Sequence, residues 1–598
     1  MSNIFTKVKV GKAADGYNKF NLTHDHMLTT DFGQIFSVNN IDCLIGDKFK
    51  INCKQFGRVA PMVFPTYGDV GMRLISCFVP YYLVGDDVES YMAGLKQYAG
   101  RAATGRYITR QNLDVLFYGS AYSSSGTPSG LPYLKEDPDY EIPENPTMDT
   151  KKPPYIFLVI RPDGNTRAYR ANYAGKYLLK VLRTLGYDIS GILDFTQPQG
   201  NNFGTRNGNY RLNALPLLCY MRAYADLMLP TTLYQSSPLL KYLHDVKAKN
   251  EDVVQSDGVL ILQKLREVIP LVMSVYYDSD YFTSAWQDSN SPISNLVSSI
   301  DELDVQYGNA NLDIALNTAT SGRTETWLGE NPNVSLSAQQ LRFLRSFDNF
   351  VRRNNLVGYR EYNAIYSRFG IKPSQMRSNY TQLIDIRNMP LTVGDVTATA
   401  QTEDTKLGSY AGKGFTNGDN HIEFECKDFG FFIQFAHLYV KPVYFQGFRK
   451  HCLKNNAFDH YQPEFDGVGS APISRMELVN NSSADVYGWT ERYNEYRFSL
   501  DQITGDFAND EQMYAWHTGR IFDTYPTAQT DSMLKYIPDD NGNYEFDRIF
   551  STQNVDNPFD HFYQTWHFDI EALRQLKQIG SVQNLGVGDI VLDKSGSI

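Results

Sequence analysis

Three continuous apolar runs of strand length constrain this chain most. They span residues 72–79, 155–160 and 431–440, and a proline lies within two residues of the end of each. Such runs are typical of strands buried on both faces, as in the core of a β-sandwich. Long polar stretches such as 118–152 and 395–419 separate them, and a compact domain keeps loops that long mainly as functional surfaces. We therefore predict two packed antiparallel sheets with elaborated loops, because the βαβ alternation of a doubly wound α/β fold is missing.

Few helices are predicted, and they fall between the strand-like runs. A Ser-x-x-Gln capping box at 337–340 precedes an amphipathic run with apolar residues on one face and arginines on another. Further helices are predicted at 217–229 and at 256–268, the second with Ser256 as its N-cap. The long loops are therefore expected to contain these helices.

The charge balance restricts how this chain could contact nucleic acid. It has 56 Lys and Arg residues against 67 Asp and Glu residues, a net charge of −11. Proteins that coat duplex DNA usually carry a strong positive excess. Any nucleic-acid contact of this chain must therefore be local.

Cysteine usage and hydropathy predict the cellular setting. The six cysteines are scattered with no Cys-x-x-Cys pair, which favours free thiols in a reducing compartment. The N-terminal residues do not read as a signal peptide, and the most apolar run is too short to span a membrane. We therefore expect synthesis in the cytoplasm.

One basic segment stands out within this acidic chain. Residues 341–377 hold eight Lys or Arg residues against two acidic ones, with aromatic residues interleaved. Arginine beside stacking rings is the chemistry of single-stranded nucleic-acid grooves. An amphipathic helix with a solvated arginine face, or a subunit interface, would produce the same pattern. The candidate DNA-contact residues are Arg342, Arg345, Arg352, Arg353 and Arg360, together with Lys7, Lys9 and Lys12 of a basic N-terminal arm at residues 1–20.

Motifs for catalysis and for metal binding are incomplete in this sequence. The glycines at 412, 414 and 418 match neither a Walker A motif nor a dinucleotide fingerprint, so we interpret them as a turn. His24 and His26 could lie on one side of a strand, but no third metal ligand can be assigned near them, and we interpret the pair as structural. We predict a non-catalytic protein with no cofactor and no metal.

Nine short motifs occur in a specific order along the chain. They are NLTHD at 21–25, GDKF at 46–49, RVAP at 58–61, FVP at 78–80, DYFTSA at 280–285, RFG at 368–370, GKG at 412–414, YQPEF at 461–465 and WHTGRIF at 516–522. In these motifs and their order the chain resembles the major capsid proteins of the Microviridae, specifically the gokushovirus-like single-stranded DNA bacteriophages.

The resemblance implies an all-β fold, an eight-stranded antiparallel viral jelly roll with long loop insertions containing a few helices. It implies a single capsid protein over residues 1–598, with a surface insertion at 230–280 that forms protrusions at the threefold axis. It further implies a T=1 icosahedral shell of 60 copies around a circular single-stranded DNA genome. The implied partners are that DNA on the inner surface, scaffolding and minor pilot or DNA-binding proteins, and a host-cell surface receptor. The expected location is the virion, without a membrane.

Two other classes of protein stay open from the sequence. One is another virion surface component, such as a spike. The other is a β-sandwich carbohydrate-binding protein or glycosidase, which the high aromatic content would suit. Tyr and Phe outnumber Trp, however, and secreted carbohydrate enzymes normally carry an export signal, so the capsid interpretation is favoured.

Overall fold

The structure is a computed structural model. It describes residues 17–109, 133–142, 155–160, 165–188, 192–194, 210–287, 379–397, 410–551 and 560–576, apart from short gaps within these ranges and a few isolated positions.

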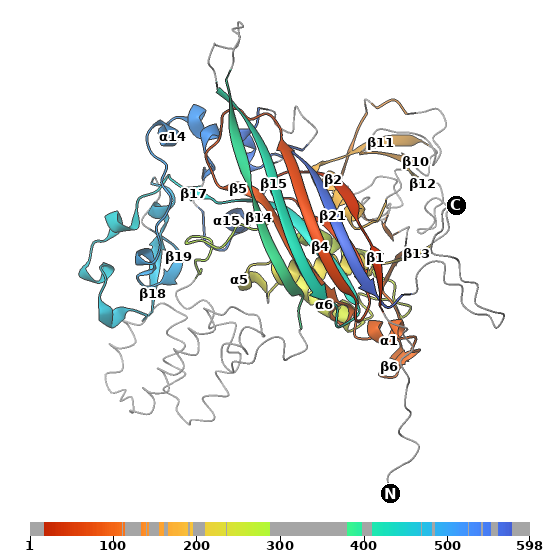
Figure 1. The fold of residues 1–598 in the computed structure, drawn as a ribbon. Helices are drawn as coiled ribbons and strands as arrows, with labels where there is room; N and C mark the ends of the chain where they lie inside the picture. Colours follow the sequence, from red (N-terminus) through yellow and green to blue (C-terminus); the bar gives the residue numbers. More distant parts are fainter. Residues whose placement is uncertain are drawn as a thin grey trace, which may run out of the picture.

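A nine-stranded antiparallel sheet forms the framework of the chain (Figure 1). Its strands follow the order β1-β21-β4-β15-β14-β5-β16-β3, and β2 also pairs with β21. Apart from β14 and β15, which are consecutive along the chain, neighbours on this path are far apart in the sequence. The strands are β1 (Asn18–Asn21), β2 (His24–Thr30), β3 (Ile35–Cys43), β4 (Lys48–Val59), β5 (Val70–Pro80), β14 (Gln382–Thr397), β15 (Tyr410–Glu425), β16 (Gly430–Val440) and β21 (Phe562–Arg574).

The strand β14 joins the two halves of this sheet. Its residues 382–390 pair with β5, whereas its residues 391–397 pair with β15. The sheet therefore curls into the half-barrel seen in Figure 1. This architecture confirms the predicted all-β class with long insertions that contain a few helices, and the curled sheet is consistent with a jelly roll, with nine strands where eight were expected.

The apolar runs of the sequence form the buried centre of the sheet. The strands β5 and β16 pair along their whole length, and nearly every residue of both is buried. Phe78 faces Phe432 across this pair, and Ile75 faces Phe435. The predictions for residues 72–79 and 431–440 are confirmed, and so is the short strand β10 (Ile156–Ile160).

Helices from the long insertion cover one face of the sheet. The helix α4 (Leu215–Leu227) is buried along nearly its whole length, and it packs against β5 and β16. The helix α3 (Tyr173–Thr184) packs against β3, with the Asn172 side chain capping its N-terminus. The helix predicted at 217–229 is thus confirmed. The helix predicted at 337–340 and beyond lies outside the described residues.

The helix predicted at 256–268 is shorter than expected. The helix α7 (Leu262–Val268) begins after Ile261, and Ser256 does not cap it. Residues 255–259 instead form a tight turn, in which the Gln255 N–H donates to the Val259 carbonyl oxygen. Gly258 takes a φ of 89°, which a side chain would oppose. The turn therefore prevents the helix from starting earlier.

The segment 230–280 contributes to the main hydrophobic core. It contains α5 (Thr231–Tyr234), α6 (Pro238–Lys247) and α7, and α6 packs against α4. Leu239, Leu243 and Val246 on α6 are all buried in that core. Only the outer faces of these helices are therefore free for a role at the surface.

Short elements complete the described structure. The strands β9, β10, β11 and β12 form a small mixed sheet, and β18 pairs with β19 beside a second, smaller core. The remaining strands and helices are β6 (Gln97–Tyr98), β7 (Arg101–Ala102), β8 (Tyr107–Thr109), β9 (Leu134–Glu136), β11 (Thr166–Ala171), β12 (Ile192–Asp194), β13 (Arg211–Asn213), β17 (Val443–Tyr444), β18 (Ser470–Ser474), β19 (Val486–Glu491), β20 (Gly519–Arg520), α1 (Val88–Met92), α14 (Asp506–Asn509) and α15 (Asp531–Leu534).

The cysteines follow the prediction made from their spacing. All six are free thiols, and five of them are buried. Burial raises the pKa of the Cys53 thiol to about 12, which keeps it protonated and unreactive. The five buried cysteines act as small apolar residues of the core.

Candidate assembly surface

One face of the main sheet is open to solvent and carries a ladder of charges. Alternate residues of β4 point outward, and Lys48 and Lys50 each lie opposite an acidic residue of β15. The Nζ–Oε distances are 3.5 Å from Lys48 to Glu425 and 3.3 Å from Lys50 to Glu423. The hydrogen bond from Lys50 lowers the pKa of the Glu423 carboxyl. These exposed pairs add little stability, but they disfavour a shifted register and leave this end of the face close to neutral.

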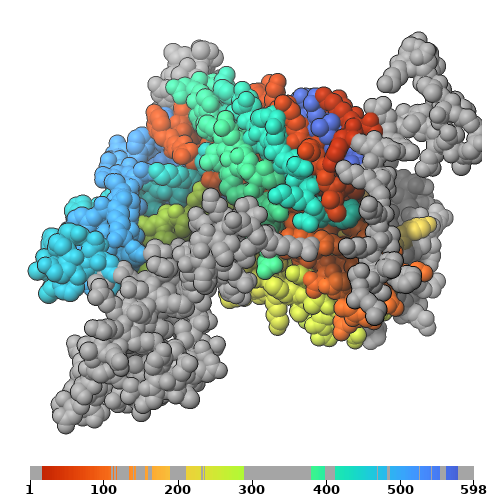
Figure 2. Space-filling view, turned by 60° about the horizontal axis from the view of Figure 1, so that its bottom comes forward, coloured from red at the N-terminus to blue at the C-terminus, as the bar shows by residue number. Residues whose placement is uncertain are grey.

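The other end of the same face is aromatic. Phe56, Phe415 and Tyr563 project from neighbouring strands, and each is 41–42 % exposed. Arg58 lies between Phe415 and Tyr563 in the register, and its guanidinium carbon is 5.7 Å from the centre of the Phe56 ring. Figure 2 shows residues of β14 and β15 side by side at the molecular surface. Aromatic side chains with arginine are enriched in protein interfaces, so we call these four residues the aromatic end and treat it as the best contact candidate.

The strand β2 offers a second kind of contact at the edge of the sheet. Within the described residues it pairs on one side only, with β21. Met27 on this strand is 81 % exposed, and a cavity of about 500 Å³ lies alongside. Open strand edges pair readily with a strand of another chain. The cavity is lined by residues including Met27, Leu28, Tyr155, Lys180, Arg183 and Tyr563.

A further cavity lies at the smaller core and is rich in paired charges. It measures about 410 Å³. Lys450 lies 3.0 Å from Glu477, and Lys454 lies 2.8 Å from Glu495. Burial raises the pKa of the Glu477 carboxyl, although the neighbouring lysine opposes this shift. These two lysines are thus matched by acids within the chain, whereas Arg449, which also lines the cavity, donates to the carbonyl oxygens of Leu500 and Asp501.

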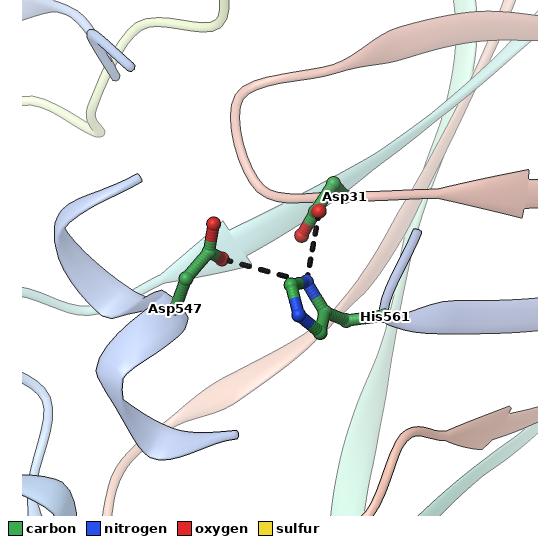
Figure 3. Close-up of side chains that lie close together, drawn as sticks. All are labelled: Asp31, Asp547 and His561. Carbon is green, nitrogen blue, oxygen red and sulfur yellow. Dashed lines mark hydrogen bonds and ion pairs between the residues drawn. The ribbon is translucent and has the colours of Figure 1, made fainter. Parts of the chain in front are cut away.

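Three buried polar side chains meet beneath the sheet (Figure 3). Asp31 follows β2, Asp547 lies in the short helix η13 (Glu545–Ile549), and His561 immediately precedes β21. Their ligand atoms all lie within 4.8 Å of one another, and this is the group within the described residues that could hold a metal ion. The sequence analysis missed it, because the three residues form no motif and the aspartate and the histidine that bond are 530 positions apart.

The candidate DNA-contact residues fall outside the described residues. This applies to Arg342, Arg345, Arg352, Arg353 and Arg360, and to Lys7, Lys9 and Lys12 of the N-terminal arm. Their role as DNA contacts therefore stays a prediction.

The paired histidines of β2 have local structural partners. The His24 ring stacks on Phe568, with the ring centres 5.2 Å apart. The Nδ1 atom of His26 lies 2.8 Å from the carbonyl oxygen of Val38. The structural interpretation of this pair agrees with these contacts.

The interpretation of the glycine motif as a turn is wrong. Residues 412–418 lie within the regular strand β15. Gly412 exchanges backbone hydrogen bonds with Met62, at 3.0 and 3.2 Å, and a Cβ there would come within 2.6 Å of the Phe64 carbonyl oxygen. The glycine therefore permits a close approach of two backbones, which a sequence pattern alone does not distinguish from a turn.

The described surface is that of a structural protein that works by association, with a broad exposed sheet, an aromatic end and an open strand edge. The chain belongs to the family of the phage capsid protein (F protein), whose sequence model matches residues 9–104 and 315–582, more than half of the chain. The resemblance found in the sequence is thereby confirmed, and this family is structural rather than enzymatic. The carbohydrate-binding or glycosidase alternative is not favoured.

Two curated relatives carry the name capsid protein VP1. The protein of Bdellovibrio phage phiMH2K is 28 % identical over 103 residues, which make up 16 % of this chain and 19 % of that protein. The protein of Chlamydia phage 1 is 21 % identical over 221 residues, which make up 34 % of this chain and 37 % of that protein. The chain thus matches less than half the length of either relative.

The family match coincides with the main sheet. All nine of its strands lie within the two matched ranges, whereas residues 105–314 between them are unmatched. The unmatched range contains α3 to α7 and the small sheet around β10. The predicted insertion at 230–280 lies within it. In the part of the chain that the structure describes, no helix has the length and apolar character needed to cross a membrane.

Proposed function

We propose that this chain is the major capsid protein of a small single-stranded DNA bacteriophage, and that its copies self-assemble into a closed icosahedral shell. The observation that carries the proposal is the family match to all nine strands of the main sheet. The match includes the strands that bear the aromatic end and the open edge of β2, so the surfaces suited to association belong to the shared framework.

The shell proposed is a T=1 particle of 60 copies. Closed symmetry lets each subunit repeat the same few contacts, and closure makes weak contacts cooperative. The aromatic end supports this proposal, because Phe56, Phe415 and Tyr563 offer large apolar area at low cost in side-chain entropy. Protrusions at the threefold axis are proposed for the outer faces of the helices in segment 230–280.

The genome and the other partners follow from the same proposal. We place circular single-stranded DNA against the inner surface. Its proposed contacts are Arg342, Arg345, Arg352, Arg353 and Arg360, together with Lys7, Lys9 and Lys12 of the N-terminal arm. A local basic patch can bind DNA within an acidic chain, because screening confines the effect of distant charges. Scaffolding and minor pilot or DNA-binding proteins, and a host-cell receptor, complete the proposed set. Synthesis would take place in the bacterial cytoplasm and the final location would be the virion.

The proposal is tested by a change at the aromatic end that leaves the fold intact. Phe415→Asp replaces an exposed ring by a charge, and Asn417→Asp adds the same charge two residues along the same exposed face. We expect the first variant to lose particle formation and the second to keep it, as measured by sedimentation and electron microscopy of the full chain expressed with its phage partners. Both variants should unfold at the temperature of the unaltered chain.

Two outcomes would contradict the proposal, one for the aromatic end and one for the capsid function. If Phe415→Asp and Asn417→Asp form particles equally well, the aromatic end is not an assembly contact. If the unaltered chain forms no closed particles even when all other proteins of the phage are supplied, the capsid function itself is excluded.

A further inference from the structure

The buried cluster of Asp31, Asp547 and His561 is a site that assembly does not explain. The three side chains are at most 1 % exposed, and they come from the turn after β2, from η13 and from the residue before β21. The distance from the His561 Nδ1 atom is 2.9 Å to Asp31 Oδ2 and 3.9 Å to Asp547 Oδ1. One nitrogen and two oxygens thus converge on one point (Figure 3).

One oxygen of this cluster has no hydrogen-bond partner in the structure. Asp547 Oδ2 accepts a hydrogen bond of 2.7 Å from the Tyr544 N–H, whereas the buried Asp547 Oδ1 accepts none. Buried polar atoms without a partner are rare in proteins, because each costs the hydration it has lost. This oxygen lies within 4.8 Å of the ligand atoms of Asp31 and His561, so a group bound between the three side chains would give it a partner.

The charge of the cluster also calls for a positive group. Within the described residues, His561 is the side chain that forms an ion pair with Asp31 and with Asp547. Two carboxylates beside one imidazole are balanced either by protons or by a divalent cation with neutral histidine.

We propose that Asp31, Asp547 and His561 form a binding site for a first-row divalent metal ion of the Zn²⁺ type. One imidazole nitrogen with two carboxylate oxygens is a donor set that Zn²⁺ accepts, whereas Ca²⁺ requires six or more oxygens. The His561 ring stacks on Phe550, with ring centres 4.3 Å apart and planes 5° from parallel, and this contact fixes the direction of Nδ1.

The bound ion would connect three distant parts of the chain. It would link the turn after β2, the helix η13 and the start of β21, which pairs with β4 on one side and with β1 and β2 on the other. Metal binding of this kind adds to the stability of the folded state, because the unfolded chain has no preformed site. The ion would therefore act as a structural clamp on the framework of the subunit.

The test uses the full chain purified without chelator. We expect about one Zn²⁺ per chain by mass spectrometry of the metal, and a lower unfolding temperature after treatment with EDTA that added Zn²⁺ restores. Asp547→Asn keeps the size of the side chain and an acceptor for the Tyr544 N–H, but it removes a ligand charge. This variant should hold less than a tenth of the metal and should not respond to EDTA.

A matched control separates this site from metal on the surface. Asp25 forms an exposed pair with His567 across the same two strands, β2 and β21, without a second carboxylate. Asp25→Asn should leave the metal content and the response to EDTA unchanged. If Asp547→Asn does not fold, the absorption spectrum of Co²⁺ added to the unaltered chain is compared with that of Co²⁺ in water. A buried site with one nitrogen ligand should change the spectrum.

Two results would overturn the proposal. The first is an unaltered chain with no bound metal and no change in unfolding temperature with EDTA or Zn²⁺, while Asp547→Asn is equally or more stable. Shared protons would then balance the cluster, because asparagine imitates a protonated aspartate. The second is an equal loss of bound metal in the Asp25→Asn and Asp547→Asn variants. That result would assign the ion to the surface.

Discussion

Arg222 and Asp226, one turn apart on α4, form a buried ion pair with an Nε–Oδ2 distance of 2.9 Å. Asp226 also accepts hydrogen bonds from the Tyr234 hydroxyl, at 2.8 Å, and from the Thr381 N–H, at 2.7 Å. Arg222 donates to the Asn379 carbonyl oxygen, at 2.7 Å. The pair therefore ties the inserted helices α4 and α5 to the residues that lead into β14 of the main sheet.

Removing the charge of Asp226 should destabilise the chain strongly. Asp226→Asn leaves the Arg222 guanidinium buried without its counter-charge, and breaking a buried pair in this way costs about 3–5 kcal/mol. Urea unfolding of the purified chain measures the loss. Asp252→Asn, at an exposed position of the same insertion, is the control and should change the free energy of unfolding by less than about 0.5 kcal/mol. Equal stability of the two variants would contradict the role given to the pair.

The buried face of α6 should contribute to the stability of the core, independently of any role of its outer face. Leu239 is fully buried among the residues of the main hydrophobic cluster, so Leu239→Ala should cost about 2–5 kcal/mol of unfolding free energy. Lys241 on the same helix is exposed, and Lys241→Ala should be nearly neutral. A Leu239→Ala variant as stable as the unaltered chain would show that segment 230–280 does not support the sheet.

Gly412 of β15, where the backbone pairs with Met62, should not tolerate a side chain. A Cβ at Gly412 would lie 2.6 Å from the Phe64 carbonyl oxygen, so Gly412→Ala must displace backbone, at a cost of about 1–3 kcal/mol. Gly394 in the neighbouring strand β14 has its closest atoms at 3.9 Å, which makes Gly394→Ala a matched control. Thermal unfolding of both variants tests this account, and the same loss at both positions would refute it.

The buried histidine of β16 should make the fold sensitive to acid. His437 is 2 % exposed, and burial, with the nearby Arg73 as a smaller cause, lowers its pKa from 6.5 to about 4. Asp278 opposes this shift. The His437 imidazole therefore binds a proton below pH 6.5 in the unfolded chain, but only below about pH 4 in the folded chain. The contribution of neutral His437 to the free energy of unfolding is fully present above pH 6.5. It is lost as the pH falls from 6.5 to about 4, by up to about 3 kcal/mol.

Urea unfolding between about pH 7 and about pH 5 measures this effect. A His437→Gln variant has no imidazole, so its free energy of unfolding should fall by about 2 kcal/mol less than that of the unaltered chain over this range. The exposed His460 provides the control, and His460→Gln should follow the unaltered chain. Parallel pH profiles for His437→Gln and the unaltered chain would exclude His437 as the source.

The sequence predicts the strands of the sheet that are buried on both faces but not those with one exposed face. The strands β5 and β16 are continuous apolar runs, which stand out in any sequence. The strands β4 and β21 alternate buried and exposed residues and carry many charges, and the sequence analysis missed them although a period of two was present. The pairing of β21 with β4 joins residues about 500 positions apart, and local patterns contain no information on such pairing.

The functional surfaces depend even more on tertiary structure. Arg58, Phe415 and Tyr563 are unremarkable as single residues, and only the register of three strands brings them together. The same holds for Asp31 and His561, which meet because Thr30 of β2 pairs with Phe562 of β21. The glycine motif was misinterpreted for the opposite reason. Its local pattern suggested a turn, whereas Gly412 is needed because distant backbone approaches it closely.

Cryo-electron microscopy of native particles, with the absorbance at 260 and 280 nm of the same fraction, tests the central claim most directly. We predict uniform closed icosahedral shells built from 60 copies of this chain, with the main sheet as the framework of each subunit and nucleic acid inside. A chain that stays a monomer or a small oligomer without nucleic acid, even with every other protein of its phage supplied, would contradict the account.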